Sequence, residues 1–288
     1  MCTTKMLARS ARRLSPMAAK RPLTQLGVPN KRPATSANCS TTTMVAENPF
    51  KEEFEKYRDH LNEMNDKRER LVKASRDVTQ NSKKVIFQVH RIGKHNQQTV
   101  LNQAEKDIEG VTTQHVSRIT KELQGSDNDS WKLRRAYSPG MQEYVEAATV
   151  LEFCKTGTLL TLADLNNRLT KLSDPSTRPF KINLSDYLLG IGDLTGELMR
   201  LAISRVADGE VEVANTICNF VRDLYKDLSL VAPIMDDNYE MNKKMETMLQ
   251  SLVKIENACY AVRVRGSEYI TDAQGEQYRY TLALDEEG

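Results

Sequence analysis

Apolar residues recur along the chain with the spacing of α-helices, and the longest such pattern runs from about residue 49 to residue 92. Its positions step alternately by four and three residues. The stripe comprises Phe50, Phe54, Tyr57, Leu61, Met64, Arg68, Leu71, Ser75, Val78, Ser82, Val85, Val89 and Ile92, three of which are polar interruptions. Such a heptad pattern predicts one long helix, roughly 65 Å in length, with other helices packed along it.

Similar patterns predict further helices downstream. They cover about residues 98–123, 141–155, 161–172, 185–206, 211–227 and 239–264. Residues 125–130 read as a polar turn, Ser138-Pro139-Gly140 as the segment before a helix, and Ser185-Asp186 as a helix cap. Only the run 278–284 has a weak strand-like alternation. The predicted fold is all-α, a bundle of about six or seven long antiparallel helices.

Proline separates the beginning of the chain from this helical body. Four of the nine prolines lie in residues 1–46, among Ser, Thr and Arg, and none lies between Pro49 and Pro139. An internal proline costs a helix about 3 kcal/mol, so the long gap suits long helices. We therefore expect a disordered basic segment over residues 1–46, a helical domain over residues 47–268 and a C-terminal tail over residues 269–288.

The net charge of +2 hides an uneven distribution. Residues 1–46 carry eight Lys or Arg and no Asp or Glu, and subtracting that +8 leaves −6 for the remainder. Nucleic-acid binding by the helical body would therefore need a local basic patch. No apolar run approaches the roughly 18 residues of a membrane span, so no membrane association is expected.

The five cysteines are odd in number and widely spaced, without a C-x-x-C pair. This pattern argues against a disulfide framework and against a zinc site. It favours a reducing compartment, in which buried cysteines act as small hydrophobic residues.

Two acidic pairs are candidates for chemistry. Glu143 and Glu146 are three residues apart, and Asp193 and Glu197 are four apart, so each pair shares one helical face. Both helices are apolar nearly all round, which predicts burial, and buried carboxylates are costly unless they are paired or bind metal. Four carboxylates from two helices would suit one or two Mg²⁺ ions. The alternatives are a solvated acidic face and a plain ion pair between Glu197 and Arg200.

The rest of the chain narrows the type of reaction. Its four histidines all precede the carboxylate helices, and we expect structural roles for them: His60, His90, His95 and His115. There is no G-x-S-x-G motif, no P-loop and no G-x-G-x-x-G motif. Acidic clusters of this kind fit metal-assisted phosphodiester hydrolysis better than acyl transfer.

A basic and aromatic segment directly precedes the Glu143 helix. It contains Lys132, Arg134 and Arg135 beside Trp131 and Tyr137. Cations next to aromatic rings are typical of single-stranded nucleic-acid binding. The alternative is that these charges are simply solvated.

Four sequence blocks carry a resemblance to a known family. They are DKRERLVKASRDVTQNSKKVIFQVHRI (66–92), PGMQEYVEA (139–147), DYLLGIGDLTGELMR (186–200) and KIENACYAVRVRGSE (254–268). In this order they resemble the translin family, and within it the translin-associated factor X (TRAX) branch more than translin itself. The resemblance spans about residues 47–268, and DLTGELMR is its most specific part.

The resemblance implies an all-α fold and assembly with translin into a hetero-oligomer. It also implies Mg²⁺-dependent endoribonuclease activity on single-stranded RNA, with single-stranded DNA as an alternative ligand. In the family this activity serves passenger-strand removal in RNA interference and tRNA processing. The catalytic acidic residues map onto Glu143, Glu146 and Asp193, with Glu197 as a further metal ligand. The competing interpretation is a non-catalytic adaptor that binds translin or nucleic acid.

The N-terminal segment matches no part of the family pattern. Its Lys20-Arg21 and Lys31-Arg32-Pro33 clusters resemble a bipartite nuclear signal. The stretch with Arg9, Arg12 and Arg13 is equally compatible with a mitochondrial presequence. We expect a cytoplasmic and nuclear protein, and the sequence leaves mitochondrial targeting open.

Overall fold

The computed structural model describes residues 50–93, 95–124, 127–172, 176, 179–235 and 238–268. The contacts divide the chain after Pro49. The predicted disorder and targeting signals of residues 1–46, and the strand-like run 278–284, lie outside the described residues. All regular structure within the described ranges is helical, which confirms the predicted all-α fold. None of the described helices is long and apolar enough to cross a membrane.

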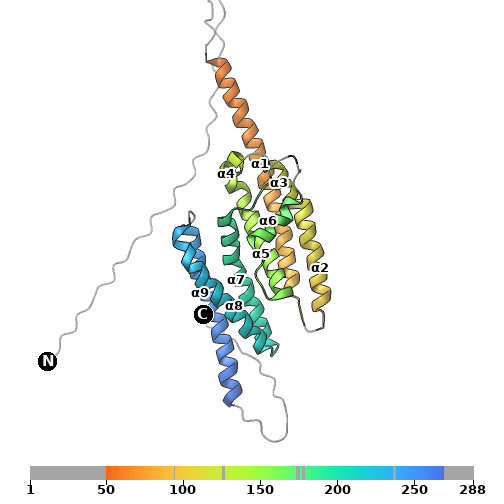
Figure 1. Cartoon of the computed structure of the whole chain (residues 1–288), viewed down its shortest axis with the longest axis vertical. Coiled ribbons are helices and arrows are strands. Elements are labelled where there is room, and N and C mark those ends of the chain that lie inside the picture. The colour runs from red at the N-terminus through yellow and green to blue at the C-terminus, as the bar shows by residue number, and fades with distance from the viewer. Residues whose placement is uncertain are drawn as a thin grey trace, which may run out of the picture. The chain divides into compact units, whose positions relative to one another are not determined.

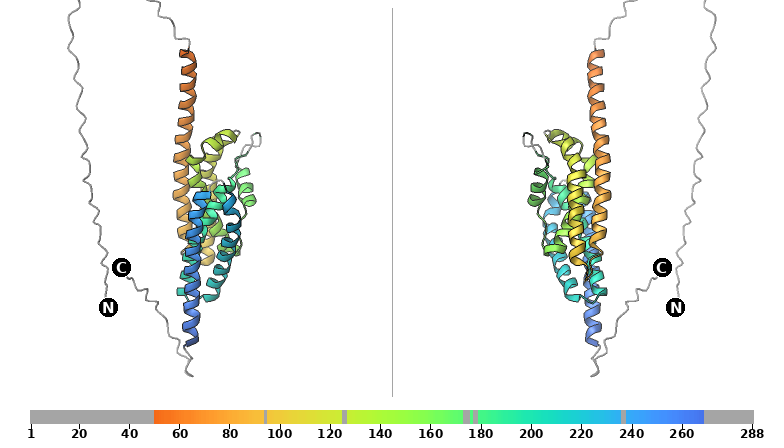
Figure 2. Two further views of the ribbon diagram at one scale, coloured as in Figure 1. Left: turned by 90° about the vertical axis from the view of Figure 1, so that its left-hand side faces the viewer. Right: turned by 90° about the vertical axis from the view of Figure 1, so that its right-hand side faces the viewer.

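Five long helices form the body of the bundle, and their order decides where the site lies. Helix α1 (Lys51–Val89) packs against α5 (Arg134–Thr156), and α5 packs against α7 (Leu184–Ala207). On its other side α7 contacts both α8 (Val211–Val231) and α9 (Asn238–Glu268). Figures 1 and 2 show this layering. Side chains from α1, α5, α7 and α9 can therefore meet around the α5–α7 contact.

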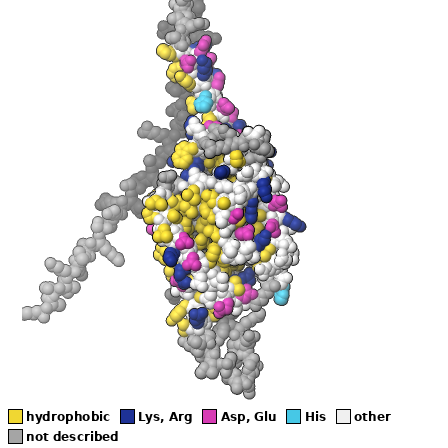
Figure 3. Space-filling model, in the orientation of Figure 1, with side chains coloured by type: hydrophobic (Ala, Val, Ile, Leu, Met, Phe, Trp, Pro, Cys, Tyr) yellow, Lys and Arg dark blue, Asp and Glu magenta, His cyan; other side chains and the backbone are white. Residues whose placement is uncertain are grey.

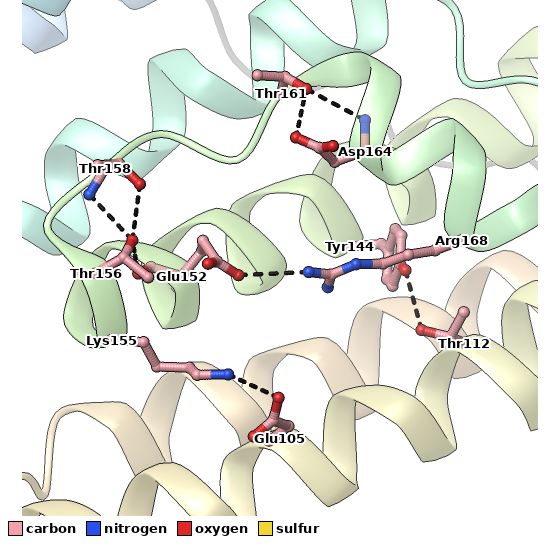
Figure 4. Close-up of polar contacts among 10 residues, drawn as sticks. All are labelled: Glu105, Thr112, Tyr144, Glu152, Lys155, Thr156, Thr158, Thr161, Asp164 and Arg168. Atoms are coloured by element: carbon pink, nitrogen blue, oxygen red, sulfur yellow. Dashed lines mark hydrogen bonds and ion pairs between the residues drawn. The ribbon is translucent and has the colours of Figure 1, made fainter.

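Shorter helices complete the bundle, most of them on the side of α1 and α5, whereas the last of them lies against α8 and α9. They are α2 (Gln97–Gly110), the π-helical turn η1 (Val111–Val116), α3 (Ser117–Leu123), α4 (Asp127–Lys132), α6 (Leu162–Thr170) and the 3₁₀ turn η2 (Ala232–Ile234). Polar contacts fix this side of α5, as Figure 4 shows. Lys155 pairs with Glu105 of α2 at 2.6 Å, and Glu152 pairs with Arg168 of α6 at 3.3 Å.

A glycine lets α5 and α7 approach closely. A Cβ atom on Gly190 would lie 2.9 Å from the backbone oxygen of Gln142 and from the side chain of Val145. Real side chains do not tolerate such contacts, so only glycine permits this spacing. The faces of α5 and α7 around it are buried, and Tyr144, Leu189 and Leu194 are fully so. The burial that the sequence predicted for both helices is confirmed.

The structure corrects two predictions upstream of α5. Part of the predicted polar turn 125–130 is helical, because α4 begins at Asp127. Helix α5 begins at Arg134 and runs through Pro139 rather than starting after it. The proline removes one hydrogen-bond donor near the start of the helix, and the next N–H, of Gly140, donates instead to Ser75 Oγ of α1 at 3.0 Å. A tertiary contact thus offsets the local cost of Pro139.

The predicted cap of α7 is also displaced. Asn183, not Ser185-Asp186, is the N-cap, and its side chain accepts a hydrogen bond from the Ser185 N–H. Asp186 is fully buried and accepts from Arg134 at 2.8 Å and from Ser138 at 2.6 Å. Asp186 is a residue type that favours caps, but here it pairs with Arg134 of the neighbouring helix α5.

The two halves of α1 differ in burial although they share one apolar stripe. From Leu71 onward the stripe is buried against the bundle. The first four apolar side chains of the stripe are instead exposed by 56–68%: Phe50, Phe54, Tyr57 and Leu61. We call residues 50–61 the projecting arm, and Figure 3 shows its hydrophobic side chains standing clear of the body. The predicted long packing partner is therefore present for only part of α1 within the described chain.

Candidate functional site

The two predicted acidic pairs come together at the α5–α7 contact. Glu143 and Glu146 lie on α5, and Asp193 and Glu197 lie on α7. The charges of the other three carboxylates all act on the pKa of Glu146, which places them in one electrostatic neighbourhood. We call these four residues the carboxylate cluster. The structure thus unites the residues that the sequence nominated as catalytic and metal-binding.

Glu146 is the least compensated member of the cluster. Its exposed fraction is 8%, and it is the one of the four that makes no ion pair with a described residue. Burial raises the pKa of Glu146 to about 8, and the charges of Asp193, Glu143 and Glu197 add to the rise. Near neutral pH this carboxyl therefore either holds a proton or requires an added cation.

Glu197 is instead held in its charged form by hydrogen bonds from two neighbouring side chains. His90, just after the end of α1, donates through Nε2 to Glu197 Oε2 at 2.6 Å. Arg200 donates to both carboxylate oxygens, at 2.8 and 3.1 Å. Burial works against the charged form, but the His90 hydrogen bond and the Arg200 charge outweigh it, so the pKa of Glu197 is lowered. The ion pair of Glu197 with Arg200, one of the alternatives open from the sequence, is present.

His90 was missed by the sequence reasoning, which gave all four histidines structural roles. It lies 107 residues before Glu197, so no local spacing connects the two. Its position at the end of the α1 stripe was the one available signal. In the structure this end of α1 faces α7, which brings the imidazole to the carboxylate cluster.

Two lysines from outer helices also reach the cluster, and neither was predicted to. Lys83 of α1 pairs with Glu143 at 3.0 Å, and Lys244 of α9 pairs with Asp193 at 2.5 Å. Contact with Glu143, together with the charges of Glu146 and Glu197, raises the pKa of Lys83. Three of the four carboxylates therefore already have a cationic partner from the chain itself.

The donor chemistry of the cluster suits a hard divalent cation, because it consists of carboxylate oxygens without thiols. However, no group of three or more His, Cys, Asp or Glu side chains in the described part of the chain has a geometry that could hold a metal ion. In the structure Glu143 is instead paired with Lys83 of α1, and Asp193 with Lys244 of α9. Mg²⁺ binding by these residues stays a prediction, and it requires the two lysines to give way.

The predicted nucleic-acid patch separates into two kinds of residue. Lys132 and Arg135 are exposed, as is Trp131 at 64%. Arg134 instead turns inward to the buried carboxylate of Asp186. Tyr137 is also buried, and its hydroxyl donates to the Ser130 carbonyl at 2.9 Å. Neither Arg134 nor Tyr137 belongs to the exposed surface on which RNA contact was predicted.

Comparison with known proteins identifies relatives over most of the chain. The pattern of the Translin family matches residues 66–266. Translin-associated protein X of Mus musculus is 36% identical over 256 residues, which cover 83% of this chain and 84% of the mouse protein. The Translin-associated protein X homolog of Schizosaccharomyces pombe is 30% identical, covering 76% of this chain and 90% of its own.

Solved structures agree with this relationship at the level of fold. One described as "apo-NeC3PO" has a TM-score of 0.55 at 20% identity and covers 72% of this chain and 96% of its own. An "AfC3PO - duplex RNA complex" has a TM-score of 0.54 at 18% identity, covering 75% and 100%. Since the family match covers more than half the chain and the mouse relative aligns over most of both sequences, this chain belongs to the translin family.

Proposed function

We propose that this chain is the catalytic subunit of a Mg²⁺-dependent endoribonuclease that acts on single-stranded RNA in a complex with translin. Glu146 carries the proposal, because it is a buried carboxyl without a cation, surrounded by three further carboxylates. Acids whose pKa is strongly perturbed by burial and by neighbouring charges cluster at functional sites. A divalent cation is the ligand that would relieve the repulsion.

The comparisons support the proposal at a coarser level. The relatives are named for association with translin, and one protein of the same fold was solved with duplex RNA. Neither observation assigns a reaction to this chain. The reaction is inferred from the carboxylate cluster and from the family resemblance of the motifs that carry it.

Glu143, Glu146, Asp193 and Glu197 would hold the metal. Bound there, Mg²⁺ would supply positive charge next to the scissile phosphate and would make a water molecule acidic enough to serve as the nucleophile. Glu146 would release its proton as the site fills. His90 would fix the orientation of Glu197, as the outer partners of metal ligands commonly do.

The RNA would approach over the start of α5. Lys132 and Arg135 offer exposed cations and Trp131 offers a ring on which a base can stack. Glu143 lies about two helical turns beyond Arg135 on the same helix, so a strand held at the patch lies within reach of the cluster.

The test is a cleavage assay on the assembled complex. The chain is co-expressed with translin, and the purified complex is given single-stranded RNA with Mg²⁺ or with EDTA. Cleavage should require Mg²⁺, and Glu146→Ala or Asp193→Ala should abolish it while assembly is retained. Glu152→Ala, a carboxylate on α5 outside the cluster, is the matched control and should cleave normally. Near-normal cleavage by both cluster variants would refute the proposal.

A second function, a non-catalytic adaptor, is favoured by one observation. The projecting arm exposes four large hydrophobic side chains along one stripe, and such surface usually marks an interface. We place translin on surfaces of this kind, so the isolated chain should aggregate or stay inactive, while co-expression should give a defined hetero-oligomer. Light scattering decides this, and a monodisperse, active monomer would contradict it. An assembled complex without Mg²⁺-dependent cleavage would leave the adaptor function standing.

A further inference from the structure

The side chain of Lys244 extends across Gly192 of α7 to reach the carboxylate cluster. Its aliphatic stem lies over Gly192 of α7, where an added Cβ would come within 3.2 Å of Lys244 Cδ and 3.4 Å of its Cβ. A larger residue at position 192 would require the stem to move by a few tenths of an ångström. The glycine directly before Asp193 therefore leaves the space through which Lys244 approaches that carboxylate.

The pairing is well shielded on the lysine side. The side chain of Lys244 is 18% exposed and that of Asp193 is 40% exposed. The positive charge of Lys244 also acts on Glu146, where it opposes the rise in pKa. One ammonium group thus compensates carboxylates from both α5 and α7.

Lys83 makes the corresponding contact from the opposite side of the cluster. It comes from α1, pairs with Glu143, and feels the charges of Glu146 and Glu197. Its side chain is 55% exposed, so its ion pair is more strongly screened by water. Of the two lysines, Lys244 is the one held in place by its surroundings.

We propose that Lys244, assisted by Lys83, is a built-in competitor of the metal ion: its ammonium neutralises the carboxylate cluster in the metal-free protein and leaves Asp193 when a divalent cation binds. This inference rests on the proposed function in taking the cluster as the metal site. Its physical basis is that the ammonium group and a metal ion need the same lone pairs of Asp193. Two positive charges bound to one carboxylate also repel each other.

Two consequences follow for the protein. Without metal, Lys244 keeps the repulsion among the carboxylates low enough for α5 and α7 to stay packed. With metal, the energy needed to displace Lys244 weakens the measured affinity. A divalent ion carries twice the charge of a monovalent one and repels the ammonium group more strongly, so the lysine should favour divalent over monovalent ions at this site.

Metal binding and thermal unfolding of the complex with translin test the inference. Lys244→Met keeps an unbranched stem over Gly192 and removes the charge. Lys243→Met removes the same charge from the adjacent, exposed position and controls for general electrostatics. Mn²⁺ is the probe, with the dissociation constant taken from calorimetry and the unfolding midpoint measured in EDTA and in Mn²⁺.

Lys244→Met should bind Mn²⁺ about five- to tenfold more tightly than the wild type, as expected when a partly buried competing ion pair is removed. Its unfolding midpoint should fall in EDTA and recover in Mn²⁺. Lys243→Met should match the wild type in both, and Lys244→Arg, which restores the charge, should return most of the affinity to the wild-type value. Weaker or unchanged Mn²⁺ binding by Lys244→Met would overturn the inference.

RNA cleavage by the same samples separates this inference from the proposed function. Tighter Mn²⁺ binding by Lys244→Met in complexes that never cleave RNA would support the competitor role and remove the ribonuclease proposal. Mg²⁺-dependent cleavage by the wild type, with identical Mn²⁺ affinities for Lys244→Met and Lys243→Met, would do the reverse. If neither the wild type nor Lys244→Met binds Mn²⁺, there is no metal to compete with and the inference fails.

Discussion

Asp186 and Glu146 are both buried carboxyl groups at the contact between α5 and α7, yet their surroundings are opposite. Asp186 is fully buried and accepts hydrogen bonds from Arg134 and Ser138. Glu146 has no cation paired with it and lies among three other carboxylates. The chain itself compensates the charge of Asp186, whereas the charge of Glu146 is left without a paired cation.

The difference separates a structural acid from a functional one. A buried charge costs stability unless hydrogen bonds and an opposite charge compensate it, and Asp186 meets that condition within the fold. Glu146 does not, so the fold tolerates a cost there that either protonation or a bound cation relieves. Burial alone, which both residues share, gives no indication of function; the completeness of compensation does.

The largest expected effect is on Asp186. Asp186→Ala leaves the guanidinium of Arg134 inside the protein without its carboxylate, and breaking a buried pair in this way costs about 3–5 kcal/mol. The thermal unfolding midpoint of the complex should fall sharply, or assembled complex should be lost. Asp223→Ala, an exposed carboxylate on α8, is the control and should unfold like the wild type. A small loss for Asp186→Ala would mean that the pair has no structural role.

Substitution of Glu146 should have the opposite effect on stability and make the metal-free protein more stable. The pKa of Glu146 is about 8 in the folded protein and 4.5 is the ordinary value, so the folded state binds the proton more tightly. Stability associated with this group is complete below about pH 4.5 and is lost as the pH rises to about 8. In EDTA, Glu146→Gln should therefore be more stable than the wild type at pH 8, by on the order of 1–3 kcal/mol.

Unfolding curves of wild type and Glu146→Gln between pH 5 and pH 8.5 check this. The difference between the two proteins should grow with pH across that window. A constant difference, or a variant that is less stable at pH 8, would show that Glu146 is compensated in the folded protein after all.

The features that depend on local pattern, namely the long helices and the buried acidic residues, could be predicted from the sequence. Helical periodicity placed the long helices, and the apolar surroundings of Glu143, Glu146, Asp193 and Glu197 predicted that these acids are more than a solvated face. Spacings of three and four residues are local properties of a helix, so they do not depend on contacts with the rest of the chain.

The partners of these acids were out of reach of the sequence. His90 meets Glu197, and Lys244 meets Asp193 across 51 positions, only because α1 and α9 pack on either side of α5 and α7. Arg134 was likewise predicted to be a surface cation, because its contact with Asp186 on another helix is not visible in the local sequence. Long-range pairing depends on helix order and rotation, which periodicity does not encode.

The smallest expected effects are those of substituting the exposed cations Lys132 and Arg135. These substitutions should affect RNA binding, whereas substitution of Arg134 should affect stability. Lys132→Ala with Arg135→Ala should weaken binding of single-stranded RNA and reduce its dependence on log salt by about 0.7 per charge. The fold should be unaffected, because both side chains are exposed. Arg134→Ala should instead lower the unfolding midpoint. A salt slope unchanged in the double variant would show that the patch is only solvated.

The most direct test of the central claim is the shift in unfolding midpoint that Mg²⁺ causes in the complex with translin. For the wild type the midpoint should rise with Mg²⁺ at constant ionic strength, since a ligand that binds only the folded state stabilises it. Glu146→Gln should lose that shift, while Glu152→Gln should retain it. An equal Mg²⁺ shift in wild type and Glu146→Gln, or no shift in the wild type, would contradict the assignment of the carboxylate cluster as the metal site.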